Sequence, residues 1–449
     1  MDAPGGDVAR LAGFKRHRLA VRDEAFCAAG VELDAHPAFD DNGHVVARVR
    51  VGRLSGAGLP TLQHDLDAIG VPGEGRAKGE ALGGAGAGDV VVPDRGHRRR
   101  VSRPVGFQIS PRPRGVPMPI QAAGLGNAIM DALVRVEDDA LLAELGLTRG
   151  QMHPVDHDRW EAVHARVADF GVEVHSGGSC ANTMQTMGLL GADVLYCGQI
   201  GDDAQGQAYA RAMTANVGKH HLVIHPSHKT GKCLSLISAR DGERTMLTDL
   251  GAAVHLPAIG AFADHIRDAR VLHLTGYLFL GGPVREAAFE AIQVAAAAGV
   301  PISLDVADPF VARMIREDLL ALFRDHVDIA FLNREEAELV TGKPPEEALH
   351  ELADLVDTVV VKLGSQGSLV RRGGVTSRIQ VYPTAVADTT GAGDSYAGAF
   401  LYAWLQGWTP AQCGELGSRV AALTVGQIGA VVRDQAGLMA ARQIVGGAA

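Results

Sequence analysis

Short runs rich in β-branched residues alternate with helix-like segments after residue 118, and this alternation restricts the possible folds more than any other feature of the chain. The apolar runs occupy residues 194–198, 271–274, 301–305, 329–333 and 358–362. Helical patterns lie between several of them, as over 181–190 and over 284–298, which Gly299 ends. Because parallel strands need such crossover connections, the sequence predicts an α/β fold with a mainly parallel central sheet and helices on both faces.

Polar residues stand where several strand-like runs end. These residues are Asp131, Asp305, Asn333 and Lys362. Ligands of open parallel sheets bind beyond the carboxyl ends of the strands, so these side chains are expected at one binding site.

One stretch departs from the alternation. Residues 232–238 and 244–248 both have the composition of strands, and the turn signal Asp241-Gly242 lies between them. The pattern predicts a β-hairpin within residues 229–250.

A run of small residues, Asp388-Thr389-Thr390-Gly391-Ala392-Gly393-Asp394, precedes a segment whose apolar spacing over 395–403 predicts a buried helix. The first amides of a helix have no intrahelical partner and attract anions, and glycine lets a phosphate approach the backbone. A carboxylate at such a place opposes anion binding unless it acts chemically, for example by accepting a proton from a hydroxyl. The alternative is that Asp394 caps the helix and that the glycines form an ordinary turn.

Charge and cysteine content argue against several classes of protein. Residues 1–117 contain 17 basic and 14 acidic side chains, whereas residues 118–449 contain 25 and 38. An acidic body disfavours nonspecific nucleic-acid binding, which depends on Lys and Arg at the phosphates. Five scattered cysteines without a CxxC pair favour reduced thiols in a cytoplasmic protein. No apolar run is long enough to predict a membrane span.

Two motifs together resemble the signatures of the PfkB family of sugar and nucleoside kinases. Gly177-Gly178-Ser179-Cys180-Ala181-Asn182 is similar to the first signature, and DTTGAGDSYAGAF, at 388–400, is similar to the second. The resemblance covers about residues 118–435. It implies a ribokinase-like fold with a small β-sheet lid over the sugar site, and an ATP- and Mg²⁺-dependent kinase that is a monomer or a homodimer. It implies no nucleic-acid or membrane partner.

The resemblance also implies roles for residues at the acceptor side of the site. Asp394 matches the position of the catalytic base, and the loop amides match the anion hole. The remaining matched positions are, for the anion hole, Gly391, Ala392 and Gly393, and, for acceptor binding, Asp131, Gly177, Gly178 and Asn182.

On the nucleotide side, the segment from Lys362 resembles the family's strand and turn, although Lys362 can also be no more than a charge at a strand end. The positions matched to nucleotide binding are Lys362, Gly364, Gly367, Thr389 and Thr390. Asn333 and Glu336 match an Asn-x-x-Glu motif that organises Mg²⁺ through water. Asn333 as the N-cap of a charged helix start is the alternative. A monovalent cation such as K⁺ beside Asp388 is a further implication.

The acceptor is expected to be a nucleoside, with adenosine converted to AMP, because residues 126–152 look most like the adenosine-kinase-like branch. Ser179 stands where ribokinase-like members often carry Lys. A free-sugar kinase acting on ribose, fructose or a keto-deoxy sugar acid is one alternative, and a catalytically silent nucleoside-binding regulator is another. Candidates for an aromatic clamp on a purine are Phe170, Tyr277, Phe279 and Phe310. Residues 134–146 and 159–170 are predicted to form inserted helices.

Residues 1–117 are expected to form a low-complexity, largely unstructured extension. Their Gly, Pro and Arg tracts keep no helical or strand period beyond a few residues. Met118 is followed by a first strand and a turn, much as PfkB kinases begin. We therefore expect a kinase domain over 118–449, with Met118 as its true start or with a disordered segment before it.

Overall fold

The computed structural model describes residues 33–39, 45–51, 120–137 and 140–447. The chain divides into two units, residues 1–109 and 110–449, which we describe separately. In the first unit, β1 (Leu33–Phe39) and β2 (Val45–Val51) form an antiparallel hairpin. The sequence analysis missed this hairpin, although residues 47–51 alternate apolar and basic residues. The other expectations for 1–117 lie outside the described residues.

The second unit is built on a nine-stranded sheet with the order β16-β15-β14-β13-β12-β11-β3-β7-β8. Its strands pair in parallel except at one edge, where β15 and β16 are antiparallel. The strands are β3 (Ala122–Leu125), β7 (Val194–Gly201), β8 (His220–His225), β11 (Leu272–Thr275), β12 (Ile302–Asp305), β13 (Ile329–Asn333), β14 (Thr358–Lys362), β15 (Ser368–Arg372) and β16 (Val375–Ile379). The predicted strands at 329–333 and 358–362 are therefore confirmed.

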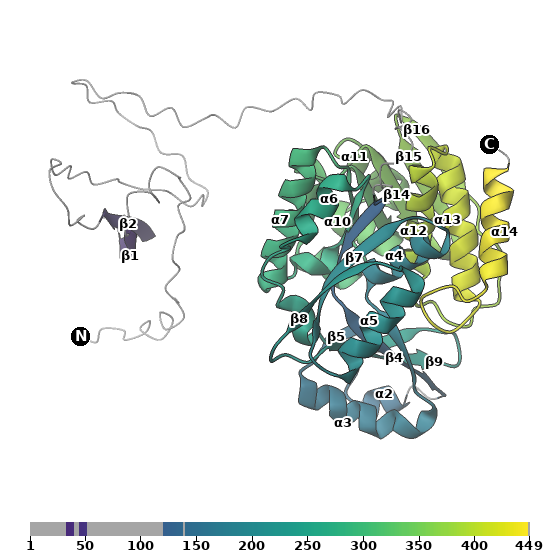
Figure 1. Cartoon of the computed structure of the whole chain (residues 1–449), viewed down its shortest axis with the longest axis horizontal. Helices are drawn as coiled ribbons and strands as arrows, with labels where there is room; N and C mark the ends of the chain where they lie inside the picture. Colours follow the sequence, from purple (N-terminus) through teal and green to yellow (C-terminus); the bar gives the residue numbers. More distant parts are fainter. Residues whose placement is uncertain (1–32, 40–44, 52–119, 138–139, 448–449) are drawn as a thin grey trace, which may run out of the picture. The chain divides into compact units, whose positions relative to one another are not determined.

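Helices cover both faces of this sheet, as predicted (Figure 1). One apolar cluster joins the sheet to α6 (Phe262–Asp268), α7 (Pro283–Ala298), α8 (Pro309–Met314), α9 (Arg316–Asp325), α10 (Arg334–Thr341) and α11 (Pro345–Ala353). A second cluster joins the opposite face to α4 (Ser179–Leu189), α5 (Ala204–Asn216), α12 (Ala392–Leu405), α13 (Pro410–Val425) and α14 (Gln435–Gly446). Gly299, with φ 72°, ends α7 as the sequence indicated.

A second, five-stranded sheet with the order β5-β10-β9-β4-β6 forms the lid. Its strands are β4 (Ile129–Val136), β5 (Met152–Pro154), β6 (Glu173–Gly177), β9 (Gly231–Ser238) and β10 (Arg244–Asp249). The predicted hairpin is the antiparallel pair of β9 and β10. The helices α2 (Ala140–Glu144) and α3 (His157–Val167) pack against this sheet through an apolar cluster that contains Trp160 and Leu236.

Two expectations for the lid region were wrong in part. Residues 134–136 belong to strand β4 and not to a helix, because their apolar side chains pack in the lid cluster and on β9. Asp131 lies inside β4 and does not close a strand of the central sheet. Asp305, Asn333 and Lys362 do end central strands.

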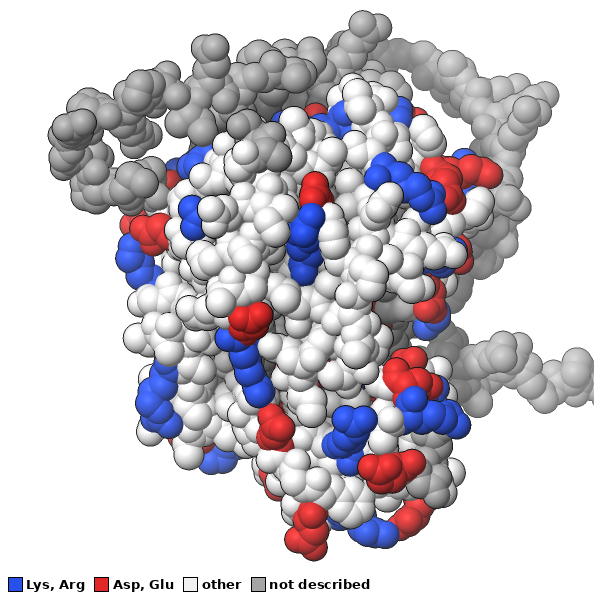
Figure 2. Space-filling model, turned by 90° about the vertical axis from the view of Figure 1, so that its right-hand side faces the viewer, with Lys and Arg blue, Asp and Glu red and all other residues white. Residues whose placement is uncertain are grey.

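The surface carries charged side chains of both signs, as the numbers of acidic and basic residues in the sequence lead one to expect. On the face shown in Figure 2, acidic and basic side chains are interspersed. Among the described residues such side chains form ion pairs, for example Arg419 with Glu415. Within the described residues, no helix is long and apolar enough to cross a membrane.

Candidate active site

A large cleft of the second unit lies between the carboxyl ends of the central strands and the lid, with a volume of about 760 Å³. The lid contributes side chains from β4, β5, β9 and β10, and the sheet contributes the ends of β11 to β14. The loop before α12 closes a third side. Fourteen of the fifteen site residues predicted from the sequence line this cleft; Gly177 is the exception. Ligand binding at the carboxyl ends of parallel strands is the expected geometry.

The Asp394 carboxylate is held by the helix that carries the first glycine-rich motif. Ser179 donates a hydrogen bond from Oγ to Asp394 Oδ1 at 2.7 Å, and Asn182 donates from Nδ2 to Oδ2 at 2.8 Å. Both donors stand in the first turn of α4, whereas Asp394 stands in the first turn of α12. Burial raises the pKa of Asp394, and the bonds from Asn182 and Ser179 oppose that rise without cancelling it. The arrangement fixes the position of a carboxylate that binds protons more readily than usual.

The loop before α12 offers free amides. Gly391 is the N-cap of α12 with φ 70°, a left-handed conformation that favours glycine, and a Cβ there would lie 2.4 Å from the Cβ of Ala430. The amides of Gly393 and Asp394, in the first helical turn, have no intrahelical acceptor. The amide of Ala392, which the sequence also assigned to the anion hole, donates to the carbonyl of Thr389 at 3.3 Å.

The Asp388 carboxylate fixes this loop through hydrogen bonds. Its Oδ1 accepts hydrogen bonds from the amide and the hydroxyl of Thr390, at 2.8 and 2.5 Å, and its Oδ2 accepts from the amide of Gly429 at 2.9 Å. The side chain is fully buried. Asp388 therefore ties the glycine loop to the segment that follows α13.

Lys362 lies beside the loop and is more than a charge at a strand end. Its Nζ donates to Asp305 Oδ2 at 2.8 Å, and a Cβ built on Gly393 would lie 3.1 Å from that Nζ. Burial lowers the pKa of Lys362, but the charges of Asp305 and Glu336 outweigh this effect and raise it overall. A cation at this point, together with free helix amides, favours binding of a phosphate group.

Asn333 and Glu336 form a capping box at the start of α10. The Glu336 amide donates to Asn333 Oδ1 at 2.8 Å, and the Glu336 carboxylate accepts from the amide and Nδ2 of Asn333 at 2.8 and 2.7 Å. The capping alternative considered for this motif is thus present in the geometry. Burial raises the pKa of Glu336 to about 8, although Lys362 opposes the rise.

The residues around Glu336 fit a magnesium ion bound through water. A buried carboxylate with a raised pKa gains most from a cation, and Glu336 keeps lone pairs free beyond its two hydrogen bonds. The described part of the chain has no group of three or more His, Cys, Asp or Glu that could ligate a metal directly. Magnesium usually keeps several waters and binds few protein groups besides phosphates, so such a group is not required.

On the lid side of the cleft, Asp131 of β4 lies against Gly177. A Cβ on Gly177 would lie 2.0 Å from Asp131 Oδ2, so glycine is needed there to make room for the carboxylate. Burial raises the pKa of Asp131 to about 7, and the guanidinium of Arg244 works in the opposite direction. Gly177 therefore lies behind a cleft residue and does not line the cleft itself.

Several cleft residues escaped the sequence analysis. The Arg244 side chain lines the cleft from β10, where its charge acts on the Asp131 carboxylate, and it forms no hydrogen bond or ion pair with the described residues. Asn127 lines the cleft with a buried Oδ1 that has no partner there, and Asn182 Oδ1 is in the same state. The position of Arg244 in the predicted hairpin was the available signal; Asn127 follows the first strand without any motif.

The four aromatic candidates separate into two groups. Tyr277 and Phe310 line the cleft, and Tyr277 donates from its hydroxyl to Asp308 Oδ2 at 2.8 Å. Phe279 is fully buried in the core, and Phe170 lies exposed outside the cleft. Only the first pair can contact a ligand bound in the cleft.

A parallel sheet with a β-sheet lid, an amide-bearing glycine loop and a buried carboxylate beneath the lid define the class of small-molecule kinases with a ribokinase-like fold. Comparison with known proteins agrees. The family model of the pfkB family carbohydrate kinases matches residues 152–435. The chain belongs to the PfkB family and is a sugar or nucleoside kinase.

The relatives act on different acceptors. A 5-dehydro-2-deoxygluconokinase of Shouchella clausii is 32% identical over 260 residues, which cover 56% of this chain and 80% of the relative. A guanosine-inosine kinase of Escherichia coli is 28% identical over 254 residues, with 54% and 58% covered.

Solved structures are similar over more of the chain. The adenosine kinase of Sinorhizobium meliloti has a TM-score of 0.68 at 32% identity, with 72% of this chain and 99% of that chain covered. A probable sugar kinase of Rhizobium etli has a TM-score of 0.69 at 30% identity, with 73% and 99% covered.

Proposed function

We propose that this kinase transfers the γ-phosphoryl group of ATP to the primary hydroxyl of a nucleoside, with adenosine as its acceptor. The observation that carries the proposal is the composition of the acceptor end of the cleft. Hydrogen-bond acceptors for sugar hydroxyls, namely the Asp131 carboxylate and the unpaired Oδ1 atoms of Asn127 and Asn182, stand close to apolar and aromatic walls.

The walls suit a flat base better than a free sugar. The lid presents Ile129, Met152 and Met246 to the cleft, and the core side presents Tyr277 and Phe310. An apolar slot of this kind gains free energy from burying a purine, whereas a free sugar would leave it exposed to water. The likeness to the Sinorhizobium meliloti adenosine kinase supports the same choice.

The proposed chemistry follows from the two ends of the cleft. Asp394 accepts the proton of the acceptor hydroxyl, whose oxygen attacks the γ-phosphorus while the bond to the β–γ bridging oxygen breaks and ADP leaves. The amides of Gly393 and Asp394 and the ammonium of Lys362 stabilise the transferring group. Bound Mg²⁺, held through water near Asn333 and Glu336, would neutralise nucleotide phosphate charge. Gly364, Gly367 and the Thr389-Thr390 pair border the nucleotide.

A free sugar acid is the second candidate, and Arg244 favours it. An unpaired guanidinium that faces the acceptor end could bind a substrate carboxylate. The 5-dehydro-2-deoxygluconokinase relatives support this candidate. A silent regulator is disfavoured, because such a protein would not need the positioned Asp394 carboxylate. A monovalent cation near Asp388 remains a prediction. Both oxygens of the Asp388 carboxylate already accept hydrogen bonds, which leaves less of their capacity for a cation.

A substrate screen tests the proposal. Adenosine should raise the melting temperature of the purified chain and support ADP formation from ATP, while inosine, ribose, fructose and 5-dehydro-2-deoxygluconate do so weakly. In the Arg244→Met variant adenosine should still stabilise the protein. Stabilisation by the sugar acid alone, lost in Arg244→Met, would establish the second candidate instead.

The raised pKa of Asp131 predicts a pH dependence. A protonated carboxyl loses acceptor capacity, so kcat/KM for the acceptor should rise between about pH 6 and pH 8 as Asp131 ionises. Stability should change in the opposite sense, because the folded pKa of about 7 exceeds the ordinary value of 3.8. The contribution of Asp131 to ligand-free stability is full below pH 3.8 and is lost progressively as the pH rises from there through about 7. The melting temperature of wild type should therefore fall relative to that of Asp131→Asn over this range. Equal pH profiles for both proteins would contradict the prediction.

Residues 118–449 are proposed to suffice for the activity. Every residue that lines the cleft lies at or after Asn127, and the tracts in 1–117 contain too little apolar surface to offset chain entropy. A chain that begins at Met118 should fold and turn over like the full chain, and limited proteolysis of the full chain should stop near residue 118. A protease-resistant fragment from 1–117, or loss of activity on truncation, would show that this segment contributes to the enzyme.

A further inference from the structure

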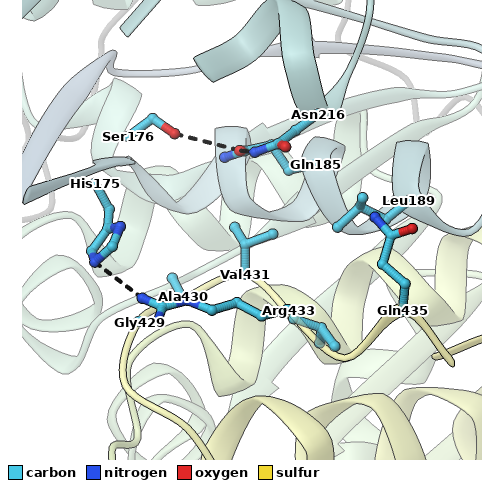
Figure 3. A pocket seen from close by; sticks show the side chains of 11 residues that line it. His175, Ser176, Gln185, Leu189, Asn216, Gly429, Ala430, Val431, Arg433 and Gln435 are labelled. Atoms are coloured by element: carbon cyan, nitrogen blue, oxygen red, sulfur yellow. Dashed lines mark hydrogen bonds between the residues drawn. The ribbon is translucent and has the colours of Figure 1, made fainter. Parts of the chain in front are cut away.

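A second cavity, of about 240 Å³, lies between β6, α4 and the loop 429–433 (Figure 3). It shares no lining residue with the kinase cleft. Ligand sites for drug-sized molecules occupy about 300–1,000 Å³, so this cavity suits a molecule of only a few heavy atoms. None of the roles assigned above uses it.

A buried donor without an acceptor belongs to a residue in the wall of this cavity, Gln185. Gln185 is fully buried, and its Oε1 accepts from Asn216 Nδ2 at 2.6 Å and from Ser176 Oγ at 3.4 Å. Its Nε2 has no hydrogen-bond partner within the described residues. Buried polar groups in folded proteins are nearly always paired, so the unpaired amide indicates that a ligand supplies the acceptor.

Two residues that line the cavity, Arg433 and His175, already contact the carboxylate of Glu173. Arg433 Nη2 lies 3.4 Å from Glu173 Oε2 and 3.2 Å from His175 Nε2, and His175 Nε2 lies 3.2 Å from the same Glu173 oxygen (Figure 3 shows the contact of Arg433 with His175). His175 first, and then Arg433, lower the pKa of Glu173 although burial opposes them. The pair of Arg433 and Glu173 is long and its side chains are 55% and 47% exposed, so it contributes little and an incoming anion can replace Glu173.

One part of the wall is apolar and consists of Leu189, Ala430, Val431 and Val432, whereas Ser176, Asn216 and Gln435 add polar groups elsewhere. Inorganic phosphate carries oxygens on all sides and would leave some of them against the apolar side chains without donors. An acid with a short hydrocarbon part matches both walls. We propose that this cavity is a second binding site for a small organic carboxylate, which accepts hydrogen bonds from Arg433 and Gln185 and packs its carbon atoms on the apolar wall.

Segments that line this cavity also contact the glycine loop and lie close to the residues that position Asp394. The amide of Gly429 binds Asp388, and Ala430 lies directly against Gly391 of the glycine loop. Gln185 follows Asn182, a donor to Asp394, by one helical turn on α4. A bound carboxylate that fixes these segments should therefore change the affinity for nucleotide, and the nucleotide should change the affinity for the carboxylate by the same factor.

Thermal-shift and calorimetric titrations of the full chain with acetate, propionate and butyrate, each up to about 10 mM, test the proposal, with inorganic phosphate as the comparison. At least one acid should bind saturably. Arg433→Met and Gln185→Met should each weaken binding by about tenfold or more, because each removes a donor to a charged group. Glu173→Gln should tighten binding, since it removes the competing carboxylate. Arg378→Met is the matched control, because Arg378 forms a similarly exposed pair with Glu346 at 3.4 Å and lines neither of the two cavities, and it should leave binding unchanged.

The outcomes separate cleanly. Absence of binding by all three acids, binding that survives Arg433→Met and Gln185→Met, or weaker binding in Glu173→Gln would overturn the site. Phosphate binding with the same response to the variants would overturn the organic ligand class. An unchanged affinity for a non-hydrolysable ATP analogue at saturating acid would overturn the link to the glycine loop.

Discussion

Replacing Asp394 with Asn should lower kcat by about 10²–10⁴-fold, which is the usual contribution of a positioned general base. The variant amide cannot take up the proton of the acceptor hydroxyl, although it can still accept the hydrogen bond from Ser179. Stability should not suffer, because burial already disfavours the charged form of this side chain. Single-turnover kinetics should place the loss in the chemical step, while calorimetry should show nearly unchanged ATP binding.

Asp434→Asn provides the control for this experiment. Asp434 also begins a helix, where its Oδ1 accepts from the amide of Gly437, but it lies outside the cleft. That variant should keep its full turnover. A turnover of Asp394→Asn close to that of wild type would remove Asp394 from the reaction.

Replacing Asp131 with Ala should lower kcat/KM for the acceptor by roughly 10²–10⁴-fold, because two hydroxyls would lose hydrogen bonds to a charged group that are worth about 1.5–3 kcal/mol each. The KM for ATP should change by only about twofold, since the carboxylate lies among the acceptor-side residues of the cleft. Initial-rate measurements with each substrate varied in turn separate the two effects.

Asp158→Ala is a suitable comparison, because Asp158 is an exposed carboxylate on α3, also in the lid region. It should leave both kinetic constants unchanged. If Asp131→Ala instead reduced the two substrates' kcat/KM values equally, or lowered the melting temperature sharply, Asp131 would support the fold and not the acceptor.

The lid sheet shows which strands can be predicted from local sequence patterns and which pairings cannot. The pair of β9 and β10 follows from residues 232–248, because strand composition and an Asp-Gly turn are both local signals. The three other strands of that sheet come from far along the chain. For example, β4 pairs in parallel with β9, and β6 pairs with the other edge of β4. Residues 134–136 look helical in sequence because apolar residues there fit either period, and only pairing with β9 decides between them.

The candidate site divides in the same way. The glycine loop, Asp394, Asn333 and Glu336 could be found from motifs, because each is encoded in a few consecutive residues. Arg244 and Asn127 could not be assigned to the cleft in this way, since nothing adjacent to them in sequence indicates which side chains they meet. The matched motif also placed Gly177 among the acceptor contacts, whereas its position behind Asp131 emerges only from the packing of β6 on β4.

By itself, the sequence determined most of the parallel strands of the central sheet, several of its helices, the lid hairpin and the kinase motifs, because period, turn chemistry and glycine placement act over short stretches of chain. The tertiary structure decided which of these motifs meet. Ser179 and Asp394 are 215 positions apart in sequence and form a hydrogen bond. Lys362 and Asp305 are 57 positions apart and also form a hydrogen bond. The second cavity, with Gln185 and Arg433 on its walls, exists only in the folded chain. Such contacts depend on the packing of distant elements against one another, which no local pattern encodes.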